Sequence, residues 1–235
     1  RNQETPGPFR MKGSLSANIG VDFSVHGPYS RDMFIRAIEF LFEVGMLKRT
    51  PRTGYQFLGT GKESVADHSF RTAVTGYVLA SLEPDADRAR VVMMCLFHDL
   101  PEARTGDHNY VNKRYVTSDE QRALLDQVQG LPFGADISEV IEEFNATQTL
   151  EARIAKDADQ IDLILELKEQ LDLGNSRAQE WLSFAMKRLT TQNGKQMAQG
   201  ILDAESDAWW FDKKTDWWIN GPEDRKPFKA PVPEK

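Results

Sequence analysis

Apolar residues recur with the 3.6-residue period of an α-helix along most of this chain. Residues suited to helix capping precede these stretches at Ser30, Ser64 and Thr149, and Ser118 with Gln121 has the spacing of a capping box. The sequence has no strong strand signals and no internal repeats. We therefore predict an all-α fold. The expected helices cover residues 30–46, 64–82, 87–98, 118–129, 136–145, 149–174, 176–189 and 195–207.

The two ends of the chain differ from this helical body. Residues 1–29 are rich in Gly, Ser, Asn and Pro, which predicts an irregular N-terminal arm, and residues 30–207 are expected to form one helical domain. Residues 208–235 form an aromatic and then Pro/Lys-rich tail that holds four of the five tryptophans. Such density predicts packing onto the domain or onto another subunit rather than a pocket lining. These tryptophans are Trp209, Trp210, Trp217 and Trp218.

Composition limits the environment and the partners of the protein. The chain has 235 residues, 28% charged residues and a net charge of −7, which indicates a soluble protein and disfavours a nucleic acid polymer as partner. No apolar run approaches the roughly 20 residues that cross a bilayer, so no membrane partner is expected. The single cysteine, Cys95, excludes an intrachain disulfide framework and favours a reducing compartment, which we take to be the cytoplasm.

Ionisable residues gather directly behind one of the most apolar segments, in the stretch "LFHDLPEARTGDHNYVNK" that begins at Leu96. His98 lies one helical period beyond Met94 and Cys95, so it falls on or beside the buried side of its helix. A buried imidazole next to the Asp99 carboxylate needs partners, and a divalent metal ion is one of them. Taken alone, a histidine and an aspartate fit a hydrogen-bonded core pair at a helix end better than a metal site.

Two other segments offer similar groups. His68 lies on the preceding predicted helix, which a short connection makes an antiparallel neighbour, although alone it is typical of the core edge. The stretch "KDADQID" places Asp157, Asp159 and Asp162 within an apolar helix. We expect Asp162 to lie on the solvated face, whereas acids in so apolar a setting also fit a ligand role.

This ordered set resembles the HD-domain superfamily of metal-dependent phosphohydrolases. The stretches "LKRTPRTGY", "ESVADHSFR", "FHDLPEARTGD" and "KDADQID" are similar to its 5′-deoxynucleotidase branch, over residues 30–189. The resemblance implies an HD-domain helical bundle of about seven or eight helices with irregular N- and C-terminal extensions. It implies one divalent ion held by His68, His98, Asp99 and Asp159, with Asp157 as the fallback for the last position. The nitrogen and oxygen ligands suit Mn, Co, Fe, Ni or Zn, and without a thiolate a structural zinc finger is excluded.

The resemblance also implies two catalytic acids. Glu102 lies one turn beyond His98 and Asp99, which is close enough to orient or deprotonate the attacking water. Asp107 matches an acid that faces the sugar of the substrate and helps to position the nucleophile. The implied substrate-binding residues are Arg52, Tyr55, Lys113 and His108, where Tyr55 stands at a position at which the family commonly has Trp.

The expected activity is hydrolysis of a phosphomonoester, namely cleavage of a nucleoside 5′-monophosphate to nucleoside and phosphate. The expected partner is therefore a small nucleotide, together with a second copy of the chain, because relatives are often dimers. One alternative is an HD-type di-iron oxygenase, which usually needs further histidine ligands, and this chain has four histidines in all. Another alternative is a non-catalytic metal- or nucleotide-binding HD protein, against which Glu102 argues.

Overall fold

Helices make up the regular secondary structure of the residues that the computed structural model describes: 30–211, 213–215, 218 and 221. Eight of them have nine or more residues, so the predicted all-α bundle of seven or eight helices is confirmed. In chain order the elements are α1 (Arg31–Val44), η2 (Gly45–Lys48), α2 (Tyr55–Leu58), α3 (Val65–Ser81), α4 (Arg88–Phe97), α5 (Glu102–Thr105), η3 (Asn112–Arg114), α6 (Glu120–Val128), α7 (Gly134–Ala146), α8 (Leu150–Asp172), α9 (Arg177–Met186) and α10 (Gln192–Asp203).

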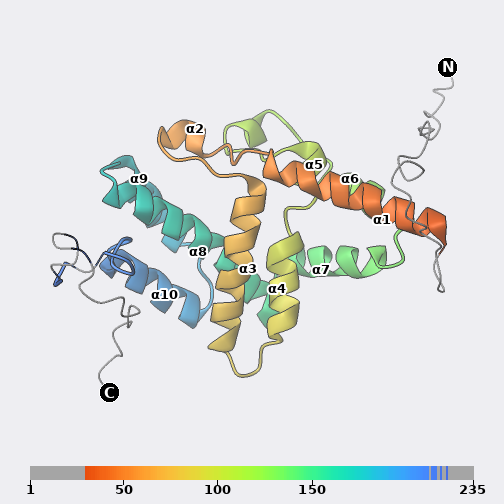
Figure 1. Ribbon diagram of the computed structural model, residues 1–235. Helices are drawn as coiled ribbons and strands as arrows, with labels where there is room; N and C mark the ends of the chain where they lie inside the picture. The colour runs from red at the N-terminus through yellow and green to blue at the C-terminus, as the bar shows by residue number, and fades with distance from the viewer. Residues whose placement is uncertain (1–29, 212, 216–217, 219–220, 222–235) are drawn as a thin grey trace.

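Three helices form the centre of the molecule. Figure 1 shows α3 and α4 side by side with α8 behind them, and their apolar faces share one core. On α8, Ala158 and Ile161 are fully buried. Gly76 of α3 permits the close approach of α4, because a Cβ atom there would lie 2.6 Å from the sulfur of Cys95. This close packing brings together the first turn of α3, the C-terminal end of α4 and the middle of α8, and the candidate site lies where they meet.

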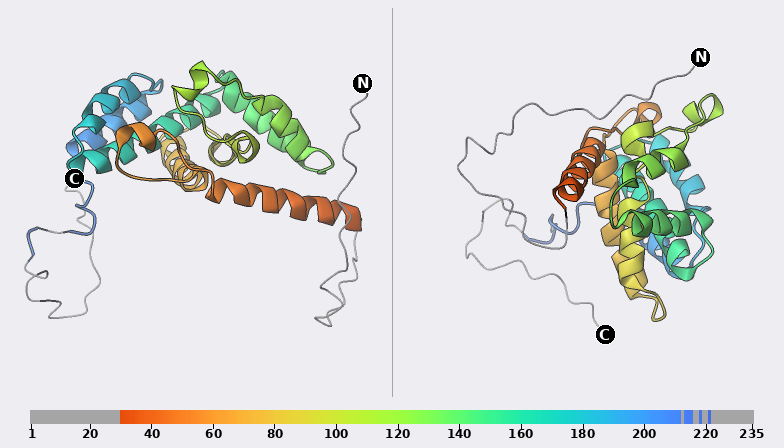
Figure 2. Two further views of the ribbon diagram at one scale, coloured as in Figure 1. Left: turned by 90° about the horizontal axis from the view of Figure 1, so that it is seen from above. Right: turned by 90° about the vertical axis from the view of Figure 1, so that its right-hand side faces the viewer.

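A second, smaller core joins η2, α6 and α7 to α1 through Phe40, Leu47 and Ile141. Phe40 is the only residue of α1 that is buried, although most of this helix is apolar. Figure 2 shows that α1 lies along the outside of the molecule. Its Leu41 and Phe42 side chains are 67% and 77% exposed, so α1 presents an apolar face to solvent.

The helix caps largely follow the sequence. The Ser30 and Thr149 side chains accept hydrogen bonds from the first turns of α1 and α8, and Ser64 forms a capping box with Asp67. The predicted capping box at Ser118 is wrong, because α6 begins at Glu120 and Asp119 caps it.

The tryptophans of the tail are not buried in the domain where the structure describes them. Trp209 is 76% exposed, and the rings of Trp210, Phe211 and Trp218 contact one another. Packing of Trp209 onto the domain is therefore not observed, and Trp217 lies outside the described residues. None of the helices in the described part of the chain combines the length and the apolar character that a membrane span requires.

Candidate metal centre

Four side chains converge where α3, α4 and α8 meet. His68 comes from α3, His98 is the C-cap residue of α4, Asp99 follows it, and Asp159 comes from α8. The Nε2 atoms of His68 and His98 are 3.3 Å apart. Asp159 Oδ1 lies 3.3 Å from His68 Nε2, and Asp99 Oδ2 lies 3.2 Å from His98 Nε2. The structure thus brings together the four residues that the resemblance implies as ligands.

The hydrogen bonds of the two rings decide which atoms face the centre. His98 Nδ1 lies 2.8 Å from the carbonyl oxygen of Cys95, which only accepts, so this nitrogen carries the proton. His68 Nδ1 lies 2.6 Å from the Asp162 carboxylate, so it is protonated as well. When each ring carries this one proton, both Nε2 atoms point lone pairs at each other and at two carboxylates. A group of acceptors alone fits a cation, and a divalent ion suits these nitrogen and oxygen donors.

The electrostatics of the cluster lead to the same conclusion. Burial and the charge of Arg52 lower the pKa of His68, but hydrogen bonds to Asp159 and Asp162 outweigh them and raise it to about 10. Burial alone would raise the pKa of Asp159, yet the hydrogen bond and charge of His68 hold it well below its usual range. At neutral pH the metal-free cluster therefore favours a second proton on His68, on the Nε2 atom that faces Asp159, and a divalent ion would take the place of that proton.

The neighbouring aspartates of α8 have other partners. Asp157 is fully buried, and its two carboxylate oxygens accept hydrogen bonds from the backbone and hydroxyl groups of Thr190 and Thr191. Asp157 therefore anchors the loop before α10. Of the two aspartates considered for the last ligand position, the structure places Asp159 at the cluster. The prediction that Asp162 lies on a solvated face is wrong, because Asp162 is fully buried and contacts His68.

The two predicted catalytic acids follow the cluster in the chain. Glu102 begins α5, and its buried Oε2 has no hydrogen-bond partner among the described residues. Burial, and then the charges of Asp99 and Asp107, raise the pKa of Glu102 to about 9. Asp107 Oδ2 accepts hydrogen bonds from the backbone and the hydroxyl of Thr53, at 2.5 and 2.9 Å. Asp107 thereby joins its own loop to the segment that carries Arg52.

The structure brings one of the four predicted substrate-binding residues to the cluster. Arg52 Nη1 lies 3.4 Å from Asp99 Oδ2, and although burial opposes its charge, the surrounding carboxylates, Asp99 first, raise its pKa. The Tyr55 hydroxyl instead donates to Glu166 on α8, at 2.5 Å.

The other two predicted substrate-binding residues lie in the segment that follows Asp107. His108 Nδ1 lies 2.9 Å from the Ser118 hydroxyl oxygen. Lys113 lies exposed on η3.

Asn109, which the sequence analysis does not single out, also carries a buried polar atom. Its Oδ1 accepts hydrogen bonds from the backbone of Val111 and Asn112, both at 3.0 Å, which fixes the orientation of the amide. Its Nδ2 is buried and has no partner among the described residues. A polar atom left in this state is costly unless a ligand or water satisfies it. The hydrogen bond from the Val111 N–H to Asn109 Oδ1 forms an Asx turn. Asparagine is common in such turns, and this preference is the signal that the sequence offers.

Lys156, the first residue of "KDAD", adds a positive charge near the cluster. Its ammonium group lies 3.7 Å from the centre of the Phe144 ring, which in turn packs 4.8 Å from the His98 ring. Burial lowers the pKa of Lys156, against the opposing charges of Asp159 and Asp99. Arg52 and Lys156 thus offset part of the negative charge of the two aspartates.

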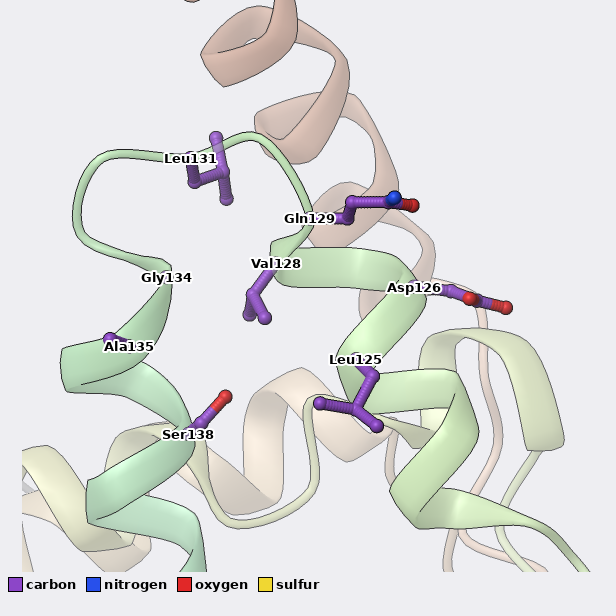
Figure 3. Close-up of a pocket in the computed structure, with 8 residues that line it drawn as sticks. All are labelled: Leu125, Asp126, Val128, Gln129, Leu131, Gly134, Ala135 and Ser138. Carbon is purple, nitrogen blue, oxygen red and sulfur yellow. The ribbon is translucent and has the colours of Figure 1, made fainter.

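Two pockets lie near α6 and α7. One, of about 460 Å³, lies between these helices and is lined by Leu125 and Val128; Figure 3 shows the polar ends of Asp126 and Gln129 pointing away from it. The Ser138 hydroxyl points inward, but no charged side chain of this lining does, so the pocket has no convergent set of polar groups. The other, of about 270 Å³, is bordered by His98 but not by the other three residues of the cluster.

A comparison with protein families assigns this arrangement. The model of the HD domain matches residues 44–201 of the chain. The chain belongs to the HD domain family. The predicted membership of the HD-domain superfamily is therefore confirmed.

Named relatives of this HD domain are nucleotidases. The chain is 34% identical over 157 residues to the 5′-deoxynucleotidase HDDC2 of Homo sapiens, which covers 64% of this chain and 73% of that protein. It is 30% identical over 142 residues to the 5′-deoxynucleotidase hdd1 of Schizosaccharomyces pombe, covering 56% and 71%.

Solved structures share the fold of this HD domain. A conserved hypothetical protein from Pyrococcus furiosus superposes with a TM-score of 0.60 at 28% identity, covering 71% of this chain and 99% of that one. A predicted metal-dependent phosphohydrolase from Magnetospirillum magnetotacticum also gives a TM-score of 0.60, at 22% identity, over 75% and 94% of the two chains, and at this identity shows the fold alone.

Proposed function

We propose that this HD domain hydrolyses a deoxynucleoside 5′-monophosphate to the nucleoside and inorganic phosphate. The observation that carries the proposal is the convergence of two imidazole rings and two carboxylates, with the half-buried Glu102 and its unpartnered Oε2 next to them in the chain. Relatives named 5′-deoxynucleotidase, matched over more than two thirds of their length, supply the substrate class.

His68, His98, Asp99 and Asp159 would hold one divalent ion, from among Mn, Co, Fe, Ni and Zn. When bound, such an ion supplies Lewis acidity, which lowers the pKa of water and offsets the charge of the phosphate. The protein itself supplies a buried setting, in which Arg52 adds a fixed positive charge for a phosphate oxygen.

Glu102 is the proposed general base. In the hydrolysis the water oxygen forms a bond to phosphorus, the bond between phosphorus and O5′ breaks, and O5′ takes up a proton. The Glu102 carboxylate accepts the proton of the attacking water and later releases it to solvent, and solvent supplies the proton that O5′ takes up. With a pKa of about 9, Glu102 holds a proton at pH 7 in the metal-free protein. Positive charge beside Asp99 would lower that pKa toward neutrality and so free the carboxylate to act as the base.

The loop that follows Asp107 would hold the rest of the substrate. We propose that Asp107 keeps this loop against the Arg52 segment, that the free amide hydrogen atoms of Asn109 donate to a phosphate or sugar oxygen, and that Lys113 adds a mobile positive charge. His108 and Tyr55 remain proposed substrate contacts, and each would have to exchange its present hydrogen bond to reach the substrate.

We also propose that the protein acts in the cytoplasm and as a homodimer. The exposed apolar side chains of α1, together with Phe70, Val74 and Tyr77 on α3, are the proposed contact residues, and a standard interface buries about 800 Å² per partner. A second copy that applies the same surface would cover these side chains.

One experiment tests the activity. The full chain is freed of metal with a chelator, each of the five ions is added back separately, and phosphate release is measured from deoxynucleoside and ribonucleoside 5′-monophosphates. We expect release to require an ion and to fall to background in His98→Ala and Asp99→Ala. Unchanged hydrolysis in these two variants would contradict the proposal, and so would ion binding with no phosphate release, which fits the non-catalytic alternative. Substrate oxidation with an iron-loaded sample would favour the di-iron alternative.

A further inference from the structure

Behind the cluster, His68 is backed by a network of charges that the proposed function does not use. Asp162 of α8 lies against the side of the His68 ring that faces away from the other ligands, and both side chains are fully buried. Its Oδ2 accepts a hydrogen bond from Nδ1 of His68 at 2.6 Å, and its Oδ1 accepts one from Nε of Arg71. Each carboxylate oxygen of Asp162 thus has a different donor.

Arg71 fixes the position of Asp162. It lies three residues after His68 on α3, so both side chains reach the same part of α8. Its remaining nitrogen atoms donate to Glu166 and Glu169, which lie one and two turns after Asp162. Three contacts along one face of α8 therefore hold the guanidinium group of Arg71 in place. Because this fixed group donates to Asp162, the Asp162 carboxylate has little freedom to rotate.

From this geometry we infer that Asp162 is a positioning residue for the metal centre, an inference that rests on the proposed function. It holds His68 in the tautomer that leaves Nε2 free as a ligand. Thr72 Oγ1, the other polar atom near His68 Nδ1, lies at 3.4 Å and can donate as well as accept, so it does not select a tautomer. Loss of a carboxylate that accepts a hydrogen bond from a metal-binding histidine commonly lowers metal affinity by about 10- to 100-fold.

Asp162→Asn tests the inference, because an amide cannot reproduce both contacts. If its NH₂ group faces His68, then His68 must accept at Nδ1 and carry its proton on Nε2, which blocks the ligand atom. If the NH₂ group faces Arg71, two donors oppose each other and the anchor is lost. We expect the dissociation constant for Mn²⁺, measured on the full chain by competition with a chelator, to rise at least tenfold.

Asp157→Asn is the matched control. Asp157 lies on the same helix, is equally buried and accepts several hydrogen bonds, but its partners are Thr190 and Thr191. We expect this variant to lose thermal stability while its affinity for Mn²⁺ stays within twofold of the parent protein. A purely structural role for Asp162 would make the two variants alike.

A second measurement needs no variant. In the zinc-loaded parent protein, nitrogen-15 spectra of the histidine rings should show His68 with its proton on Nδ1. A proton on Nε2, or an unchanged Mn²⁺ affinity in Asp162→Asn, would overturn the inference. A parent protein that binds neither ion would instead refute the proposed function, so the two failures are distinguishable.

Discussion

Replacing Glu102 with Gln separates the contribution of this residue to turnover from its effect on the free energy of unfolding. The substitution keeps the size of the side chain and removes its ability to ionise. We expect turnover of the metal-loaded enzyme at pH 7 to fall by about 10²- to 10⁴-fold, which is the usual contribution of a positioned general base. Ion binding should be retained, because Glu102 is not among the four proposed ligands.

The same substitution should stabilise the metal-free protein. The pKa of Glu102 is raised from 4.5 to about 9 by burial and by Asp99 and Asp107, so at pH 7 the folded chain holds a proton that the unfolded chain has released. One pKa unit corresponds to about 1.4 kcal/mol, which sets the cost on the order of 3 kcal/mol at pH 7. Since Glu102 is partly exposed, we expect the variant to gain about 2 kcal/mol.

The pH dependence provides the sharper test. Below pH 4.5 both states of the parent protein bind the proton, so parent and variant should be equally stable. The stability that the protonated Glu102 provides is lost as pH rises toward 9, so the advantage of the variant should grow over this range. Urea unfolding in the presence of a chelator at pH 4.5, 7 and 8.5 measures it. An equal or lower stability of Glu102→Gln at pH 8.5 would refute this account of the site.

Four further outcomes follow from the structure. Arg52→Ala should lower kcat/KM by about 10- to 100-fold, since a charged hydrogen bond contributes about 1.5–3 kcal/mol, and an unchanged value would remove Arg52 from the site. Asn109→Asp keeps the oxygen that caps Val111 and Asn112 but loses the free donor, so kcat/KM should fall while the thermal midpoint changes little. Metal removal should lower stability by about 2.7 kcal/mol relative to a sample at 100 times the dissociation constant, which calorimetry can check. Leu41→Glu on the exposed face of α1 should give a monomer by light scattering if that face joins two copies.

The fold was largely predictable because its signals are local. Apolar periodicity and capping residues predicted eight helices, and the structure has eight helices of nine or more residues in its described part. The cap of α6 was mispredicted because Ser118 and Asp119 are both good caps, and the choice depends on where the preceding loop lies. The Ser118 hydroxyl lies beside His108, from a loop ten residues earlier, and that contact is not visible in the sequence.

In the site, too, the local features are predictable and the tertiary contacts are not. This is clearest on α8, where three aspartates lie within six consecutive positions. Helix geometry separates them by known angles, but it does not say which element faces each one. Asp159 faces the two histidines, Asp157 faces the loop before α10, and Asp162 faces Arg71 and the back of His68. The sequence predicts a solvated face for Asp162, because a charged side chain on a helix surface usually faces water. That expectation fails because Arg71 of α3 supplies a buried partner, so the fate of each acid depends on residues that only the tertiary structure brings to it.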